Sequence, residues 1–296
     1  MVVLNFLLYY LIIIPISLLP FPVLYVISDF LYFNFYYVFG YRKAVVQQNI
    51  LNSFPEMSEK DRIEICKKFY RHFSDLILES IKTFTISNKQ VQKRVVCKNP
   101  EVINKYFDQK RSVIIAGGHL ANWEIFAVAV DAIIKHQAVG IYTPLSNKYF
   151  DTKMRNTRSR YGLIMVSARK VKPFFDQHIN DLTATIFAID QSPSNPRSCY
   201  WTNFLNQETG VLFGTEKFGK EYNYPVLYGR INKEKRGYYS FEFFDIGDQP
   251  KDTEHGEITE KVTRLLEKDI IASPQYWLWS HKRWKHKRPI DNKEKN

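Results

Sequence analysis

The sequence has few cysteines and lacks the short motifs of several common enzyme classes. Its three cysteines, Cys66, Cys97 and Cys199, are widely spaced and odd in number. This pattern gives no disulfide framework and favours a reducing compartment. Neither Gly-x-Ser-x-Gly nor His-Glu-x-x-His occurs, so a serine nucleophile and a zinc site of that type have no support.

Charged side chains are almost absent from the first forty residues. Only Asp29 carries a charge there, and Pro20-Phe21-Pro22 divides two apolar halves, each marginal for the roughly 20 residues of a membrane span. A signal peptide is not indicated, since a positive n-region and a small-residue cleavage site are missing. Arg42-Lys43 follow, and positive residues favour the cytoplasmic side. We predict a membrane anchor over 1–40, spanning or re-entrant. The alternative is a buried hairpin in a soluble protein.

Positive charge is in excess over the whole chain. The net charge is +12 and the isoelectric point is about 9.4, which implies an anionic partner such as nucleic acid, a membrane surface or a phosphorylated substrate. Residues 276–289 interleave aromatic and basic side chains. Such a run suits single-stranded nucleic acid or a lipid headgroup layer with tryptophans at the interface. The apolar N-terminus favours the membrane.

Alternating strand and helix patterns follow the apolar N-terminus. An α/β fold is therefore predicted, with a mixed, mostly parallel sheet flanked by helices, in a single catalytic domain over 41–296. Short apolar or β-branched runs predict strands at 112–116, 138–142, 163–166, 185–189, 225–228 and 238–244. Helical spacing and capping residues predict helices at 41–53, 58–82, 124–135, 147–160, 171–181, 210–222 and 257–272.

His119 and Glu124 are the strongest candidates for catalysis. On a regular helix they would lie roughly 140° apart, so they can meet only if the chain turns between them. The flanks predict such a turn, because an apolar strand ends at Gly117-Gly118 and Asn122 is a good N-cap for a following helix. A base oriented by an acid in this way could activate a hydroxyl group. The alternative is a histidine that only caps a helix or satisfies a buried carbonyl.

Two further segments offer candidate substrate-binding residues. Arg155, Arg158 and Arg160 lie together near the end of the predicted helix 147–160, where they could bind a phosphate or simply complement the helix dipole. Asp190 ends an apolar strand and Arg197 follows in the next loop. The ends of parallel strands gather functional residues in α/β proteins, although Asp190 could instead hold turn amides.

An ordered series of motifs over nearly the whole chain resembles the bacterial lipid A biosynthesis (late) acyltransferase family, within the lysophospholipid acyltransferase superfamily. The first motif of the superfamily is His-x4-Asp/Glu, which His119 and Glu124 match. Where the family often has proline before Asp-Gln or Asp-His, this chain has Ile189. The other matching segments are Arg42 to Asn49 with Ser53-Phe54-Pro55-Glu56, Asn147…Asp151…Arg158, Asp190-Gln191 with Arg197, Gly214-Thr215, Pro225-Val226, and Tyr276-Trp277…Trp279…His281-Lys282-Arg283.

The resemblance implies a membrane-bound acyltransferase of the inner membrane that faces the cytoplasm. It would move a fatty acyl chain from an acyl carrier protein or coenzyme A thioester to a hydroxyl of a lipid A precursor, without a covalent acyl-enzyme. His119 would be the general base, and Glu124 would fix its tautomer. Arg158, with Arg155 or Arg160, would hold a phosphate of the acceptor or of the donor. An aliphatic tunnel would measure the acyl chain. We expect no metal and no cofactor besides the thioester donor.

Two other functions remain compatible with the sequence. The same chemistry could act on another membrane lipid, such as an aminolipid, a glycolipid or a lysophospholipid. A membrane-tethered protein that only binds nucleic acid or anionic lipid is disfavoured, because the chain has no recognisable nucleic-acid module. We therefore expect a lipid acceptor, an acyl donor and a membrane as partners, and no nucleic acid.

Overall fold

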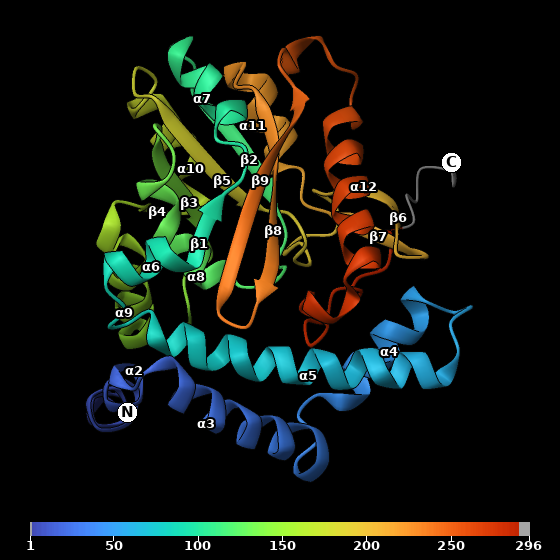
Figure 1. Ribbon diagram of the computed structural model, residues 1–296. Helices are drawn as coiled ribbons and strands as arrows, with labels where there is room; N and C mark the ends of the chain where they lie inside the picture. Colours follow the sequence, from blue (N-terminus) through green and yellow to red (C-terminus); the bar gives the residue numbers. More distant parts are fainter. Residues whose placement is uncertain (1, 290–296) are drawn as a thin grey trace.

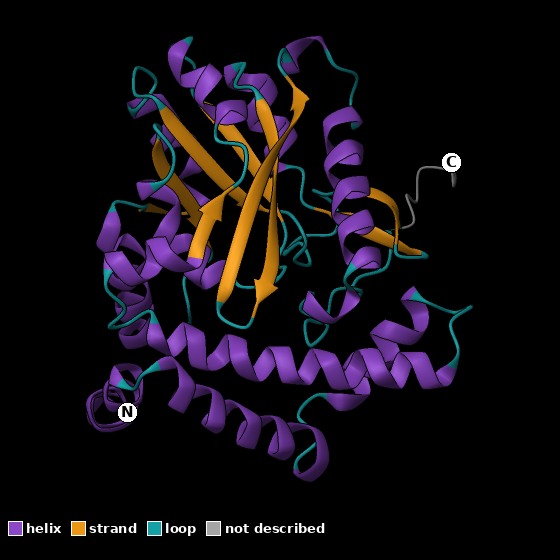
Figure 2. Cartoon of the chain, in the orientation of Figure 1, coloured by secondary structure: helices purple, strands orange, loops and turns teal. Residues whose placement is uncertain are grey.

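A seven-stranded sheet forms the centre of the computed structural model, which describes residues 2–289 (Figures 1 and 2). The strand order is β1-β9-β8-β2-β5-β3-β4, and neighbours are parallel except for β8 and β9. This confirms the predicted mixed, mostly parallel α/β sheet. The strands are β1 (Val95–Cys97), β2 (Val113–Gly117), β3 (Gln137–Tyr142), β4 (Ile164–Ser167), β5 (Thr183–Ala188), β8 (Val226–Lys235) and β9 (Tyr238–Gly247).

Helices cover both faces of the sheet. Helices α6, α7 and α8 pack on one face, and α10, α11 and α12 pack on the other. The long helix α5 lies across the end of the sheet at which β8 and the strands parallel to it finish (Figure 1). The α-helices that follow residue 40 are α4 (Lys43–Ser53), α5 (Glu59–Lys82), α6 (Asn88–Arg94), α7 (Glu101–Asp108), α8 (Trp123–Ala129), α9 (Lys148–Arg158), α10 (Val171–Gln177), α11 (Gly214–Tyr222) and α12 (Glu257–Ala272).

Strand β2 is the central strand that positions the candidate site. Its side chains from Val113 to Ala116 are all buried, as expected of a parallel strand covered on both faces. It pairs with β5 as far as Gly117 and Ala188. By contrast, the pairing of β3 with β5 stops at Gly140 and Ile186, before either strand ends. The sheet therefore opens between β3 and β5 at its carboxyl end.

A two-stranded hairpin replaces the start of one predicted helix. The helix predicted over 210–222 begins only at Gly214, because β6 (Tyr200–Phe204) and β7 (Gln207–Val211) pair as antiparallel strands. Leu205 and Asn206 connect them, both with positive φ, as a tight hairpin turn requires. Leucine is an uncommon residue at such a position, so the local sequence gave little sign of the turn.

The N-terminal hairpin, residues 2–38, packs along α5 (Figure 1). It contains α1 (Val2–Leu7), α2 (Ile14–Leu18) and α3 (Phe21–Phe33), with π-helical turns at Leu8–Ile13 and Asn34–Val38. Within the described residues no single helix has the length and hydropathy of a membrane span. The segments Val3–Leu18 and Phe21–Val38 meet those criteria only as a pair, bent by 119°. Met1 and 290–296, the ends of the predicted anchor and catalytic domain, lie outside the described residues.

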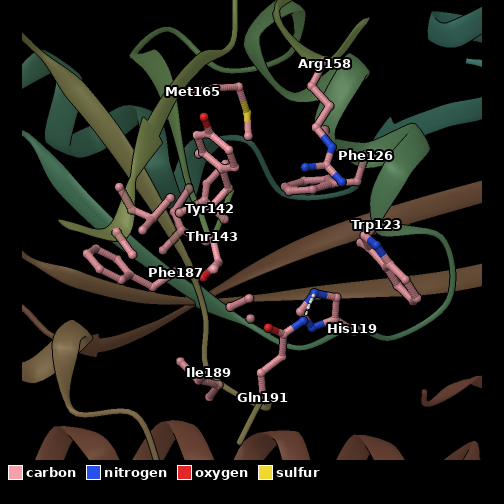
Figure 3. Close-up of a pocket in the computed structure, with 18 of the residues that line it drawn as sticks. His119, Trp123, Phe126, Tyr142, Thr143, Arg158, Met165, Phe187, Ile189 and Gln191 are labelled. Atoms are coloured by element: carbon pink, nitrogen blue, oxygen red, sulfur yellow. Dashed lines mark hydrogen bonds between the residues drawn. The ribbon is translucent and has the colours of Figure 1, made fainter. Parts of the chain in front are cut away.

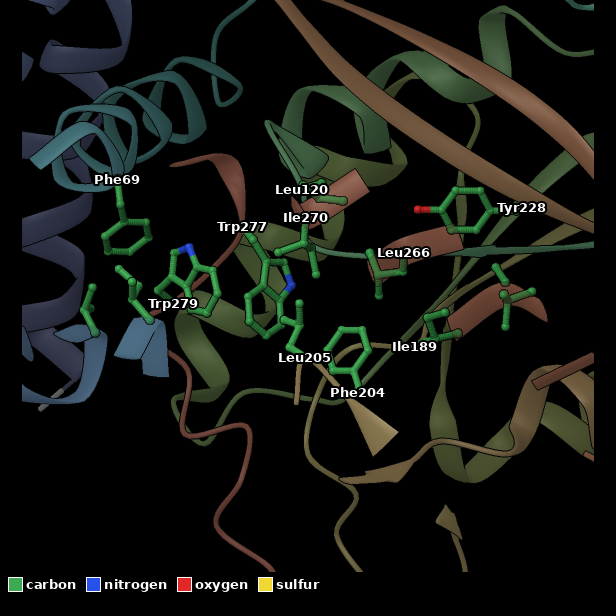
Figure 4. Close-up of a cluster of buried hydrophobic side chains, with 14 of the residues drawn as sticks. Phe69, Leu120, Ile189, Phe204, Leu205, Tyr228, Leu266, Ile270, Trp277 and Trp279 are labelled. Carbon is green, nitrogen blue, oxygen red and sulfur yellow. The ribbon is translucent and has the colours of Figure 1, made fainter. Parts of the chain in front are cut away.

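The C-terminal aromatic run lies in the core, in contrast to the predicted interfacial tryptophans. Trp277 and Trp279 are 2% and 0% exposed and belong to the cluster shown in Figure 4, where Trp277 packs edge-on against Phe204 of β6 and Trp279 packs against Phe54. The Arg283 guanidinium is buried too and donates to the Gly210 carbonyl. Lys282 and Lys285 are exposed between these buried residues. The alternation of aromatic and basic residues thus reflects a segment with one buried and one exposed side.

Candidate active site

His119 and Asp190 form a hydrogen-bonded pair where β2 and β5 end. The Nδ1 atom of His119 lies 2.6 Å from Oδ1 of Asp190, and the backbone N–H of His119 donates to Oδ2 at 2.7 Å. The indole N–H of Trp277 also donates to Oδ2, at 2.8 Å. Asp190 is buried, whereas the His119 side chain remains 15% exposed. The carboxylate of the pair is therefore fixed, and the imidazole is accessible from one side.

The register of the sheet explains why these two residues meet. Gly117 pairs with Ala188, so the residues two positions further along each strand lie side by side. The sequence predicted Glu124 as the partner that orients His119, and this expected contact is wrong. Asp190, expected to bind substrate, occupies that position instead. The strand-to-helix turn itself is as predicted, because the Asn122 side chain caps α8 by accepting from the amides of Glu124 and Ile125.

The Asp190 carboxylate sets the protonation of His119. Burial alone would lower the pKa of His119, but the charge and hydrogen bond of Asp190 outweigh it and raise that pKa above its ordinary value. Burial would raise the pKa of Asp190, yet His119 and the indole N–H together lower it to about 2. With the Nδ1 proton directed at Asp190, the Nε2 atom of neutral His119 carries the lone pair and is the acceptor of the ring. The Gln191 amide lies 3.3 Å from that atom.

Glu124 pairs with Arg158 beside His119. The Arg158 guanidinium donates through Nε and Nη2 to the two carboxylate oxygens, at 2.9 and 2.6 Å. The indole N–H of Trp123 adds a third bond to Glu124, and its ring packs edge-on against the His119 ring. A two-pronged pair of this kind fixes both side chains strongly. Glu124 also contributes to the raised pKa of His119 through its charge.

The structure brings together only some of the predicted substrate-binding residues. Arg155 and Arg158 line the cavity described below, Arg155 as an exposed side chain. Arg160 does not line it and donates to the Phe84 carbonyl at 2.6 Å. Arg197 is exposed outside the cavity, in the loop before β6. A three-arginine phosphate clamp is therefore not assembled, and Arg158 already has a carboxylate partner.

A cavity of about 940 Å³ extends from His119 into the opening between β3 and β5 (Figure 3). His119, Trp123 and Gln191 lie on one side in this view, and Met165 of β4 lies on the opposite side. Gly140 helps to keep the space open, since a side chain there would meet Met165 and Leu163. Much of the lining is apolar and comes from strands and helices on both faces, including Ile115, Phe126, Ile141, Met165, Phe187 and Phe218.

Comparison with known proteins assigns the chain to a family. The model of the family described as bacterial lipid A biosynthesis acyltransferase matches residues 2–286. A lipid A biosynthesis acyltransferase of Haemophilus influenzae is 22% identical, over 82% of this chain and 78% of its own length. Two Escherichia coli proteins, a lipid A biosynthesis palmitoleoyltransferase and a lipid A biosynthesis lauroyltransferase, are 19% and 21% identical. They cover 84% and 82% of this chain, and 80% and 79% of their own lengths. The match extends over both the N-terminal hairpin and the histidine site, and the chain therefore belongs to the bacterial lipid A biosynthesis acyltransferase family and is an acyltransferase.

Proposed function

We propose that this acyltransferase moves a fatty acyl chain from an acyl thioester to a hydroxyl group of a lipid A precursor, with His119 as the general base. The observation that carries the proposal is the position of His119. The His119 ring lines a large, mostly apolar cavity, and Asp190 bonds its Nδ1 atom, so that Nε2 is the nitrogen left to act as the base, with the Gln191 amide 3.3 Å from it. Family membership and the names of the relatives supply the lipid A acceptor.

The proposed reaction proceeds by direct attack. Nε2 of His119 takes the proton of the acceptor hydroxyl as its oxygen attacks the thioester carbonyl carbon. Asp190 stabilises the imidazolium that forms, as a buried carboxylate does for a catalytic histidine. The tetrahedral intermediate then expels the thiolate, which takes the proton back from His119 and leaves as a thiol. The products are an ester and a free thiol, and no acyl-enzyme forms. A backbone amide or a nearby cation would stabilise the oxyanion.

The cavity suits an acyl chain. Its volume lies at the upper end of the range usual for small-molecule sites, and its apolar lining favours methylene groups by about 0.8 kcal/mol each. Arg155, exposed at this cavity, is a candidate contact for a phosphate of the acceptor or of the donor. The donor would be an acyl carrier protein or coenzyme A thioester.

The N-terminal hairpin would hold the enzyme at the cytoplasmic side of the inner membrane. The side of α3 away from α5 presents apolar residues to the surroundings, with Val26 70% and Phe30 66% exposed. An exposed apolar surface of this kind is typical of a membrane contact. At the bend of the hairpin, the carbonyls of Ser17 and Leu19 accept hydrogen bonds from Lys82 of α5. Under α3, the Ser28 hydroxyl donates to Asp75 of α5. These bonds fix the exposed apolar surface to the catalytic domain.

The test is acyl transfer by the full-length protein and by His119→Ala. We expect loss of at least about 100-fold in kcat, the usual contribution of a general base. His178→Ala is the matched control, because His178 is an exposed histidine that bonds an aspartate away from the cavity. Near-normal transfer by a folded His119→Ala protein would refute the role of His119. Mass spectrometry of lipids from a deletion strain tests the acceptor: unchanged lipid A with an acyl group missing elsewhere would refute the lipid A assignment.

A further inference from the structure

A buried carboxylate lies between the N-terminal hairpin and the turn that follows His119. Glu79 of α5 is 1% exposed and accepts three hydrogen bonds, all from neutral groups. Its Oε1 atom accepts from the Tyr25 hydroxyl of α3 at 3.0 Å. Its Oε2 atom accepts from the Asn122 amide at 2.6 Å and from the Tyr239 hydroxyl at 2.7 Å. One oxygen thus bonds the hairpin, and the other bonds the catalytic domain.

Asn122 connects Glu79 to the site. Its side-chain oxygen accepts from the Glu124 and Ile125 amides, and its side-chain N–H donates to Glu79. Only this orientation of the amide satisfies both sides, because the reverse would place its NH₂ group against two N–H groups. The carboxylate of Glu79 therefore determines how Asn122 begins α8. Trp123 and Glu124, the residues that contact His119 and Arg158, are the first two residues of that helix.

A second contact from the same side of α5 supports the turn. His72, seven residues before Glu79, lies on that side and bonds the Ala121 carbonyl through Nε2 at 3.0 Å. Burial and the nearby Lys233 charge lower the pKa of His72 to about 3, so the ring is neutral and Nε2 donates its proton. Ala121 has a φ of +51°, a backbone conformation that costs energy for a residue other than glycine. The two contacts hold a strained turn in place.

Burying a carboxylate without a directly bonded cation is costly, and a simple core contact would not require one. Burial is the largest influence on the pKa of Glu79 and raises it, although the hydrogen bonds from Tyr239 and Asn122 and the more distant charge of Lys233 act against that shift. The mechanism proposed above has no use for Glu79. Its three bonded partners come from the hairpin, the helix cap and β9, so the contacts indicate a role in placing these elements relative to one another.

We propose that Glu79 is a positioning residue for acyl transfer, and that its bond to Tyr25 makes the placement of the His119–Glu124 segment depend on packing of the N-terminal hairpin against α5. This inference rests on the proposed function for its kinetic consequences. Its structural consequence, ordered backbone amides at the start of α8, is measurable without substrate.

The Asn122–Glu79 contact can be tested by exchanging amide and carboxylate. Asn122→Asp keeps an equally good helix cap, but it sets two carboxylates against each other. We expect its kcat to fall about tenfold, with KM little changed, and hydrogen exchange of residues 123–126 to accelerate. Glu79→Gln alone can still accept from Asn122 and should remain within about threefold of wild type. The double variant restores an amide-to-carboxylate bond, so kcat and exchange should both return toward the Glu79→Gln values.

The link to the hairpin has its own variant and control. Tyr25→Phe removes the donor from α3 and should accelerate exchange at 123–126 by about threefold. Tyr37→Phe, at an exposed hairpin tyrosine, should leave it unchanged. Equal exchange in these two variants would overturn the hairpin coupling, and failure of Glu79→Gln to rescue Asn122→Asp would overturn the positioning role. A wild-type protein that transfers no acyl group would refute the proposed function alone, because the exchange measurements need no reaction.

Discussion

Replacing Asp190 with asparagine would test how the carboxylate controls His119. Asp190 accepts three hydrogen bonds through two oxygens, whereas asparagine has only one acceptor oxygen. If that oxygen keeps the bonds to the His119 backbone and Trp277, the new NH₂ group faces Nδ1 of His119. Nδ1 must then accept, and the ring proton moves to Nε2. Nε2 then has no lone pair with which to take the proton of the acceptor hydroxyl, as the proposed mechanism requires.

Two contributions set the size of the expected loss. Loss of one charge-assisted hydrogen bond costs about 1.5–3 kcal/mol, which corresponds to roughly 10- to 150-fold in rate. Locking the wrong tautomer at a comparable histidine–aspartate pair lowers kcat by about 10⁴. We therefore expect Asp190→Asn to reduce kcat by about 10²- to 10⁴-fold. KM should change little, because Asp190 is buried behind His119 and does not line the cavity.

The variant should also alter two pH dependences. The raised pKa of His119 predicts that wild-type kcat/KM increases with pH through a midpoint above 6.5, and this midpoint should move to lower pH without Asp190. The raised pKa of His119 stabilises the fold below pH 6.5, and this is lost as pH rises. The lowered pKa of Asp190 stabilises it above pH 3.8, and this is lost as pH falls. The stability difference between the two proteins should therefore be largest between those values.

Steady-state kinetics and thermal unfolding at several pH values would provide the measurements. Asp181→Asn is a suitable control, since Asp181 bonds His178 in a surface pair away from the cavity. A folded Asp190→Asn protein with kcat within threefold of wild type would refute the reasoning. So would an unchanged acidic limb of kcat/KM, because the charge of Asp190 would then have no effect on His119.

Three further predictions concern other contacts. Arg158→Gln leaves the Glu124 carboxylate buried without its cation, so urea unfolding should show a loss of about 2–4 kcal/mol; an unchanged midpoint would contradict this. Met165→Trp reduces the cavity, and product mass spectrometry should show shorter acyl chains; an identical chain distribution would mean that the acyl chain lies elsewhere. Lys82→Met removes two hydrogen bonds to carbonyls at the hairpin bend, so limited proteolysis should cleave near residue 19 faster while cleavage of the rest of the chain is unchanged. Equal cleavage near residue 19 would show that Lys82 does not hold the bend.

Much of the local structure around the site followed from the sequence. An apolar strand, a Gly-Gly break and the Asn122 cap placed His119 in a loop and Glu124 in the first turn of a helix, as observed. The partner of His119 could not be obtained in this way. Asp190 lies 71 residues away, and it meets His119 only because β2 and β5 are neighbours in register. Strand order depends on packing of the whole sheet, which local patterns do not specify.

Burial was also poorly predicted for polar and aromatic residues. The alternation of aromatics and cations in 276–289 has the same pattern whether the aromatics face lipid or a protein core, and Trp277 faces the core. Glu79 lies three residues after the buried Leu76, on the apolar side of α5. A charged residue at an apolar position of a helix is a signal from which the burial of Glu79 could have been predicted. The short strand β1 and the hairpin of β6 and β7 gave no comparable signal.

The hydrogen bond from Trp277 to Asp190 has a consequence for the timing of enzyme synthesis. The two residues are 87 positions apart, so a ribosome adding 5–20 residues per second needs roughly 4–17 s to pass from one to the other. During that interval the N-terminal hairpin has already been made, while the carboxylate that orients His119 still lacks its indole donor and the core segment behind it. Under the membrane attachment proposed above, a nascent chain would therefore reach the lipid surface before its active site is complete.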